Sequence, residues 1–205
     1  DTDHAELGPI VLMDVGDNIG GGSSADSTFI LAEAQRMGVT GFLQSLYDPE
    51  AVDTCITAGV GAEITLDVGA KTDDMHGNPV RVTGVVKTVS DGIFAITRPN
   101  HGGRVSGDCG VTVRFDTTDE HTLLLTSKRT GNGSREQMYH IGIWPEEYRV
   151  VVAKGVVSPR PAYQPIAAEI ILVNTPGVTT ADLRFFDYKR IRESLYPFQL
   201  DAVYE

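Results

Sequence analysis

The sequence predicts a mixed α/β fold in which strand-loop-helix units precede a curved, mainly antiparallel β region and a mixed C-terminal part. Two observations favour this class. In residues 10–59, short apolar runs alternate with segments of helical spacing, whereas residues 62–127 alternate apolar and polar side chains as strands do. The chain of 205 residues has no low-complexity tract or sharp change of composition. We therefore expect residues 1–205 to form a single domain.

The first unit starts with the apolar run 10–13, which is typical of a buried strand. The stretch 16–24 is expected to be a loop, because its glycines disfavour regular structure. Residues 26–28 then offer N-cap side chains, and apolar residues recur at helical spacing as far as Gly38. This order predicts strand, glycine-rich loop and helix.

The second unit repeats the pattern of strand and helix. The run 41–46 predicts a strand, Asp48 is placed as a helix N-cap, and Pro49 suits the first helical turn. Gly59 is expected to end this helix.

The middle third predicts antiparallel strands in a curved sheet or partial barrel. Turn signals at 73–79, 90–92 and 99–103 separate the alternating runs. The alternation slips across Gly84 and Val85, which is where we expect a β-bulge.

The last third mixes helical and extended patterns. We expect a helix near 134–141, strands at 149–153 and 169–173, and a helical turn at 178–183. The aromatic and basic tail from residue 185 to residue 204 is expected to wrap the surface of the fold.

The charge balance restricts the classes of partner. Lys and Arg number 17 and Asp and Glu number 28, so the net charge is −11 and we expect no nucleic-acid partner. No apolar run is long enough for a membrane span and no signal peptide is visible, so we expect a cytoplasmic protein without a membrane partner. The chain begins at Asp1, which suggests a piece of a longer protein. Trp144 and the aromatic tail could cover a homo-oligomer interface.

The glycine-rich loop is the strongest candidate for a binding site. Glycine N–H groups and the start of the following helix can hold an anion or a polarised carbonyl. We expect Asp17 and Asn18 at the rim of this loop, and the alternative is a tight turn without a ligand. Neither of the common nucleotide-loop fingerprints is present. The predicted substrate-binding residues of the loop are Asp17, Asn18, Gly20, Gly21, Gly22 and Ser23.

Two arginines are further candidates. Arg160 lies between Pro159 and Pro161, and a guanidinium on such a stiff backbone can clamp a carboxylate or an oxyanion, so we predict a catalytic role. Arg129 is predicted as a second substrate contact. The alternative for both is an ordinary solvated or ion-paired surface arginine.

Residues for metal binding or serine hydrolysis do not cluster in the sequence. The five histidines are scattered, and Asp74 with His76 is expected in an exposed turn, so we predict no metal site in this chain. No serine lies in a G-x-S-x-G pattern.

Six colinear motifs together resemble the C-terminal domain of the microcystinase C family. The motifs are D-V-G-D-N-I-G-G-G at 14–22, L-Y-D-P-E-A-V at 46–52, T-S-K-R at 126–129, V-V-V-A-K-G at 150–155, S-P-R-P-A-Y-Q-P-I-A at 158–167 and N-T-P-G at 174–177.

The resemblance implies part of a zinc-dependent hydrolase grouped with metallopeptidases, acting on a small peptide or amide substrate. It implies that zinc is bound by a separate N-terminal domain, which would be the partner of this chain, and that the glycine-rich loop and Arg160 face the metal cleft. Some relatives have His and Phe where this chain has Ser158 and Pro159.

Two other functions stay open at this point. The run G-G-G-S-S at 20–24 is similar to the phosphate loop of small-molecule kinases, although nearby acids would repel phosphate. A non-catalytic binding or assembly module would also fit a glycine-rich loop and exposed arginines.

Overall fold

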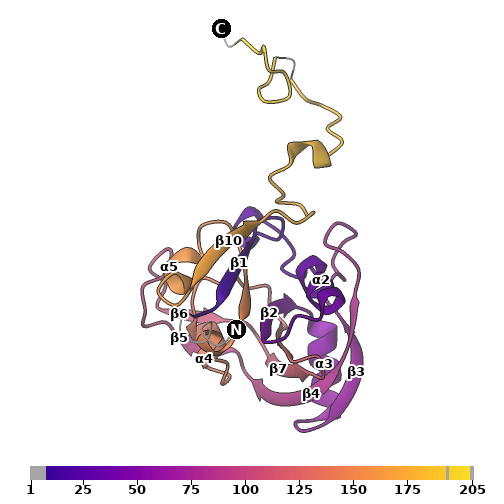
Figure 1. Ribbon diagram of the computed structural model, residues 1–205, viewed down its shortest axis with the longest axis vertical. Helices are drawn as coiled ribbons and strands as arrows, with labels where there is room; N and C mark the ends of the chain where they lie inside the picture. The colour runs from indigo at the N-terminus through magenta and orange to yellow at the C-terminus, as the bar shows by residue number, and fades with distance from the viewer. Residues whose placement is uncertain (1–7, 193, 204–205) are drawn as a thin grey trace.

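The computed structural model describes residues 8–192 and 194–203, and its main feature is a large mixed sheet (Figure 1). The strands are β1 (Ile10–Asp14), β2 (Phe42–Tyr47), β3 (Glu63–Val68), β4 (Val80–Ser90), β5 (Ile93–Ala95), β6 (Ser106–Asp108), β7 (Thr112–Thr117), β8 (His121–Thr126), β9 (Val150–Lys154) and β10 (Glu169–Val173). The helices are α2 (Phe29–Met37), α3 (Pro49–Ala58), α4 (Glu136–Tyr139) and α5 (Arg160–Tyr163), with 3₁₀ turns η1 (Ile19–Gly21), η2 (Pro145–Glu147) and η3 (Leu183–Phe185).

The sheet joins a parallel part to an antiparallel part. Its eight strands follow the order β10-β1-β9-β2-β8-β7-β4-β3, and β5 pairs with β6 in a separate hairpin. Strands β10 to β8 in this order are parallel, whereas β7, β4 and β3 continue the sheet antiparallel. The predicted α/β class is confirmed, and β8 connects the two regions because it pairs with both β2 and β7.

Both faces of the sheet are covered, so neighbouring residues on one strand enter different cores. Phe42 packs with α2 and α3, whereas Leu43 packs with α4 and α5 on the other face. Leu123 and Leu124 on β8 divide in the same way. Figure 1 shows these two pairs of helices on opposite sides of the sheet. Burial on both faces explains the nearly continuous apolar runs of the parallel strands.

The helix ends agree with the sequence signals. The Asp48 carboxylate accepts a hydrogen bond from the Ala51 N–H at 2.9 Å, and Pro49 opens α3. Gly38 ends α2 with a φ of 65°, in the left-handed region that favours glycine. No helix among the described residues is long and apolar enough to cross a membrane.

The expected position of the bulge in β4 is wrong by a few residues. Gly84 stays in register opposite Thr117, and the register shifts between Val86 and Thr88. Gly84 serves a different purpose, because a Cβ there would lie 2.3 Å from the carbonyl oxygen of Asp116. The glycine permits close strand packing.

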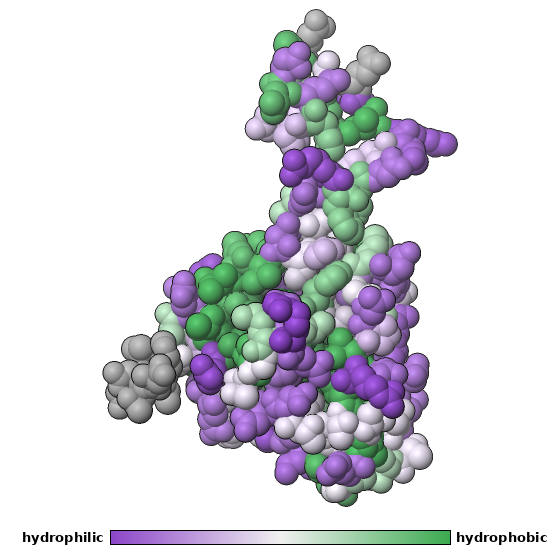
Figure 2. All heavy atoms as spheres, turned by 45° about the vertical axis from the view of Figure 1, so that its right-hand side comes forward, coloured by the Kyte–Doolittle hydropathy of each residue, from purple (hydrophilic) through white to green (hydrophobic). Residues whose placement is uncertain are grey.

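The expectation that the C-terminal tail wraps the fold is also wrong. The described residues after η3 extend away from the sheet (Figures 1 and 2). Their rings pack against one another, with centroid distances of 5.8 Å for Phe186 and Tyr188 and 5.1 Å for Tyr188 and Phe198. These local contacts replace packing on the body of the fold.

Candidate functional site

Loops at the carboxyl ends of the parallel strands surround a cavity of about 360 Å³. Gly20 lies in the loop after β1, Thr130 lies beyond β8, Lys154 ends β9, and Ser158 follows it. The β5–β6 hairpin contributes another wall. In open α/β sheets, ligands bind in the crevice outside the carboxyl ends of the strands. This cavity is therefore the candidate site.

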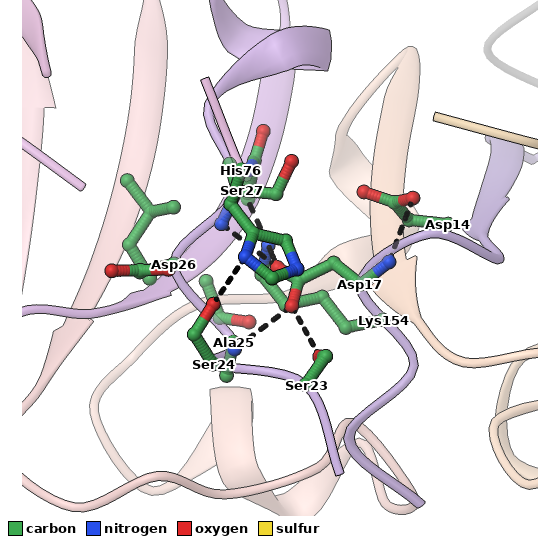
Figure 3. Close-up of polar contacts among 12 residues, drawn as sticks. Asp14, Asp17, Ser23, Ser24, Ala25, Asp26, Ser27, His76 and Lys154 are labelled. Atoms are coloured by element: carbon green, nitrogen blue, oxygen red, sulfur yellow. Dashed lines mark hydrogen bonds and ion pairs between the residues drawn. The ribbon is translucent and has the colours of Figure 1, made fainter. Parts of the chain in front are cut away.

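Asp17 holds the loop after β1 in shape (Figure 3). One carboxylate oxygen accepts hydrogen bonds from the Ser23 hydroxyl at 2.5 Å and the Ala25 N–H at 2.8 Å. The other accepts the Ser27 N–H at 2.8 Å and the Lys154 ammonium at 2.7 Å. Asp17 is thus fully buried and not at the rim of the loop as expected. Protein donors occupy both of its oxygens.

Lys154 is the residue that sequence reasoning missed. Its side chain is buried, and its Nζ also lies 3.4 Å from the carbonyl oxygen of Ser27. Its backbone N–H donates to Asn132 Oδ1 at 2.9 Å, and Asn132 donates to Gln137 at 3.0 Å. Gln137 lines the cavity. The signal in the sequence was a lysine that ends the apolar run V-V-V-A-K.

The ion pair with Lys154 keeps the Asp17 carboxyl ionised. Burial alone raises the pKa of this carboxyl, but the Lys154 ammonium and the hydrogen bonds from Ser23 and Ser27 outweigh it and lower the pKa to about 2. Asp14 differs, because burial raises its pKa more than Lys154 and Thr175 lower it. Asp14 Oδ1 accepts the Thr175 hydroxyl at 2.5 Å, whereas Oδ2 has no hydrogen-bond partner among the described residues. The two neighbouring carboxyls therefore have opposite pKa shifts.

The N–H groups of the glycine-rich loop donate inside the loop. Gly20 N–H donates to Asn18 Oδ1 at 3.2 Å, and Gly21 and Ser23 N–H donate to the Asn18 carbonyl at 2.9 and 3.4 Å. Gly22 N–H donates to the Ile19 carbonyl at 3.0 Å. In this conformation the glycines present an exposed surface, and their N–H groups already have acceptors.

Gly16 allows the loop after β1 to pack closely against the segment after β10. A Cβ at this position would lie 2.1 Å from the carbonyl oxygen of Thr175, in the segment that follows β10. The N-T-P-G motif at 174–177 thus contacts the start of the D-V-G-D-N-I-G-G-G motif.

The two candidate arginines differ in their contacts. Arg129 Nη1 donates to the carbonyl oxygen of Ser23 at 3.1 Å, so Arg129 contacts the glycine-rich loop directly. Arg160 is half-buried at the start of α5, and its guanidinium has no hydrogen-bond or ion-pair partner among the described residues. Gly20 and Ser158 line the cavity, whereas Asn18, two residues before Gly20, and Arg160, two residues after Ser158, lie outside the lining.

The expectation of an exposed turn at Asp74 and His76 is wrong for His76, which is fully buried. Its Nδ1 lies 2.7 Å from Asp73 Oδ1 and 3.0 Å from Ser24 Oγ, and its Nε2 accepts the Val178 N–H at 3.4 Å. His76 therefore joins the 73–79 turn to the loop after β1 and to the segment after β10.

This Ser, His and Asp set lacks the geometry of a proton relay. In a catalytic triad the serine and the aspartate contact different imidazole nitrogens. Here Ser24 and Asp73 both face Nδ1 of His76. The arrangement is a structural cross-link.

Metal-ligating side chains do not converge in the part of the chain that the structure describes. No three His, Cys, Asp or Glu side chains there form a group suited to a metal ion. His76 is committed to Asp73, and His121 Nε2 lies 2.8 Å from the carbonyl oxygen of Val39.

The chain is similar in sequence and in structure to proteins of known family. A sequence profile of the family described as "MlrC C-terminus" matches residues 12–190. The chain is 27% identical over 197 residues to "Microcystinase C" of Sphingomonas sp, which covers 93% of this chain and 36% of that protein. A crystal structure described as "Putative metallopeptidase" from Mesorhizobium sp. BNC1 superposes with a TM-score of 0.82 at 26% identity, over 98% of this chain and 40% of that one. The chain spans about two fifths of the length of these relatives.

Proposed function

Since the chain belongs to the MlrC C-terminal family, we propose that it is the substrate-binding part of a longer zinc-dependent hydrolase of peptides or amides. The observation that carries the proposal is the cavity at the carboxyl ends of the parallel strands, where loops from β1, β8 and β9 converge. Relatives named as a microcystinase and a metallopeptidase support the hydrolase class.

Zinc is proposed to lie in the part of the full-length protein that this chain does not span. The described residues do not fit a zinc site, because no suitable group of ligands converges among them. In such hydrolases the metal polarises the carbonyl and activates water. The residues of this chain would then hold and orient the substrate and stabilise the oxyanion that forms.

Two elements suit this task. Arg160 has a guanidinium without a partner among the described residues, which leaves its donors free for a carboxylate or an oxyanion. The loop from Asn18 to Ser23 presents exposed glycines beside the cavity, and Arg129 braces it through Ser23. Asp17, which is paired with Lys154, holds the loop through its hydrogen bonds to Ser23 and Ala25.

The phosphate-loop kinase is the weaker alternative. Such a loop needs free N–H groups for phosphate. In this loop the N–H groups of residues 20–23 donate internally, and the Asp14 carboxyl is buried at its start. No specific observation favours a non-catalytic assembly module.

The proposal is tested by comparing the isolated chain with the full-length protein. Elemental analysis and an amide-hydrolysis assay are expected to show zinc and turnover in the full-length protein, and neither in the isolated chain. About one tightly held zinc per isolated chain, or hydrolysis by it, would overturn the assignment of the metal to another part of the protein.

A further inference from the structure

The hairpin formed by β5 and β6 contributes a charged wall to the candidate cavity. Asn100, His101 and Arg104 lie in the segment that joins the two strands, and all three line the cavity. Neither the sequence motifs nor the resemblance assigned a role to these residues.

Hydrogen bonds attach residues 97 and 98, which follow β5, to Glu136 at the start of α4. The Glu136 carboxylate accepts hydrogen bonds from the Thr97 N–H at 3.3 Å, the Arg98 N–H at 3.2 Å and the Arg98 guanidinium at 3.1 Å. The Phe94 ring stacks on His140 with a centroid distance of 5.2 Å. The wall is therefore attached to the same body that carries the other lining residues.

Asn100 fixes the backbone of Arg104 on both sides. Its Oδ1 accepts the Arg104 N–H at 2.9 Å, and its Nδ2 donates to the Arg104 carbonyl at 2.9 Å. The same Nδ2 lies 3.2 Å from the Arg98 carbonyl. These bonds set the position from which the Arg104 side chain leaves the loop.

The two arginines of the hairpin differ in their partners. Arg98 pairs with Glu136 and lies 4.8 Å above the Tyr139 ring. The Arg104 guanidinium has no ion pair or hydrogen bond among the described residues. Because a guanidinium offers a planar set of donors, an unpaired one in a cavity wall is suited to an anionic ligand.

The charge of the cavity is opposite to that of the chain. The net charge is −11, yet the cavity lining includes Arg104, Lys154 and His101 and no acidic side chain. Asp17 already neutralises Lys154. Arg104 therefore remains as the cation available to a ligand, with His101 as a neighbouring donor.

We propose that Arg104, with His101 beside it, binds a carboxylate of the substrate and so selects short peptides or amides that carry a free carboxyl group. The inference rests on the proposed function, because it names the substrate group that the cavity of about 360 Å³ receives. Cavities of this size accommodate small molecules. A single unpaired guanidinium matches one carboxylate, with which it forms a bidentate pair.

The test uses the full-length protein and two N-acetylated dipeptides that differ only in a C-terminal carboxylate or carboxamide. Binding is measured by calorimetry and turnover by release of product. The wild type is expected to bind the carboxylate peptide at least about tenfold more tightly, as the loss of a charged hydrogen bond implies. Arg104→Ala should remove this preference with little effect on the carboxamide, and Arg104→Lys should restore part of it.

The control is Arg81→Ala, which removes an exposed arginine on β4 and should leave the preference unchanged. Equal binding of the two peptides by the wild type, binding of neither, or an equal loss of both in Arg104→Ala overturns the inference. Tighter binding of inorganic phosphate that depends on Arg104 overturns the choice of a carboxylate. Selective binding without turnover would instead count against the proposed hydrolase function and leave the carboxylate site standing.

Discussion

The ammonium of Lys154 lies 2.7 Å from Oδ2 of Asp17, and neither side chain is exposed. This buried ion pair connects the end of β9 to the loop that follows β1. Ala25, within that loop, has a φ of 68°, a left-handed conformation that costs a non-glycine residue about 1–2 kcal/mol. Asp17 accepts the Ala25 N–H and so helps to hold this conformation.

Removing one member of the buried pair should strongly destabilise the fold. Lys154→Met leaves the Asp17 carboxylate buried without its cation, and such a loss costs about 3–5 kcal/mol. Unfolding in urea, monitored by circular dichroism, measures the free energy of unfolding. The matched control is Lys128→Met, which breaks an exposed pair with Asp108 and should change stability little. A loss of equal size in both variants would show that burial of the Asp17 pair is not the cause.

Acid should destabilise the protein through Glu136. Burial raises the pKa of this carboxyl, but hydrogen bonds from Ser134, its own backbone N–H, Arg98 and Thr97 outweigh burial and lower the pKa from 4.5 to about 2. Because the pKa of Glu136 is lower in the folded state, ionised Glu136 stabilises the fold at pH values above the unfolded-state pKa. This stability is lost as the pH falls from about 4.5 through about 2. Glu136→Gln should therefore flatten the decrease of the unfolding free energy in this range. Glu63→Gln, at an exposed position on β3, should keep the wild-type slope, and an unchanged slope in Glu136→Gln would refute the role of Glu136.

The loop after β1 should not tolerate alanine at Gly16. A Cβ there would lie 2.1 Å from the backbone carbonyl of Thr175, so Gly16→Ala is expected to cost about 1–3 kcal/mol through forced backbone shifts. Gly131→Ala places a Cβ where no atom lies within 4 Å and should be nearly neutral. Thermal unfolding of the two variants gives the comparison, and equal melting temperatures would contradict the packing argument.

The ends of the helices could be predicted from the sequence, because capping depends on residues that are neighbours in the chain. Asp48 and Pro49 mark the start of α3, and Gly38 marks the end of α2, because caps and turns depend on neighbouring residues. The parallel pairing of β2 with β8 could not be read from the chain, since residues such as Phe42 and His121 meet only through the tertiary fold.

For the candidate site too, local features were predicted and contacts between residues remote in sequence were not. The glycine-rich loop follows β1 as expected, and its Gly20 lines the cavity. The burial of His76 depends on Ser24 and Val178, which are remote in sequence, so the turn residues around His76 gave no sign of it. Lys154 was overlooked because a lysine at the end of an apolar run is ordinarily solvated, and its partner Asp17 lies 137 residues earlier.

Arg160 should contribute to turnover in the full-length protein without affecting its metal. Arg160 is half-buried and its guanidinium has no partner among the described residues, so Arg160→Ala removes donors that the fold itself does not use. We expect turnover to fall at least about tenfold, the effect of losing one charged hydrogen bond in the transition state, while zinc content and melting temperature stay unchanged. Arg160→Lys should recover part of the activity, because lysine keeps the charge but lacks the planar set of donors. The control is Arg149→Ala, which removes an arginine at the amino end of β9, opposite the carboxyl end where the cavity lies, and it should retain normal turnover. Near-normal turnover in Arg160→Ala would exclude Arg160 from the mechanism and leave Arg104 and the glycine-rich loop as the substrate contacts of this chain.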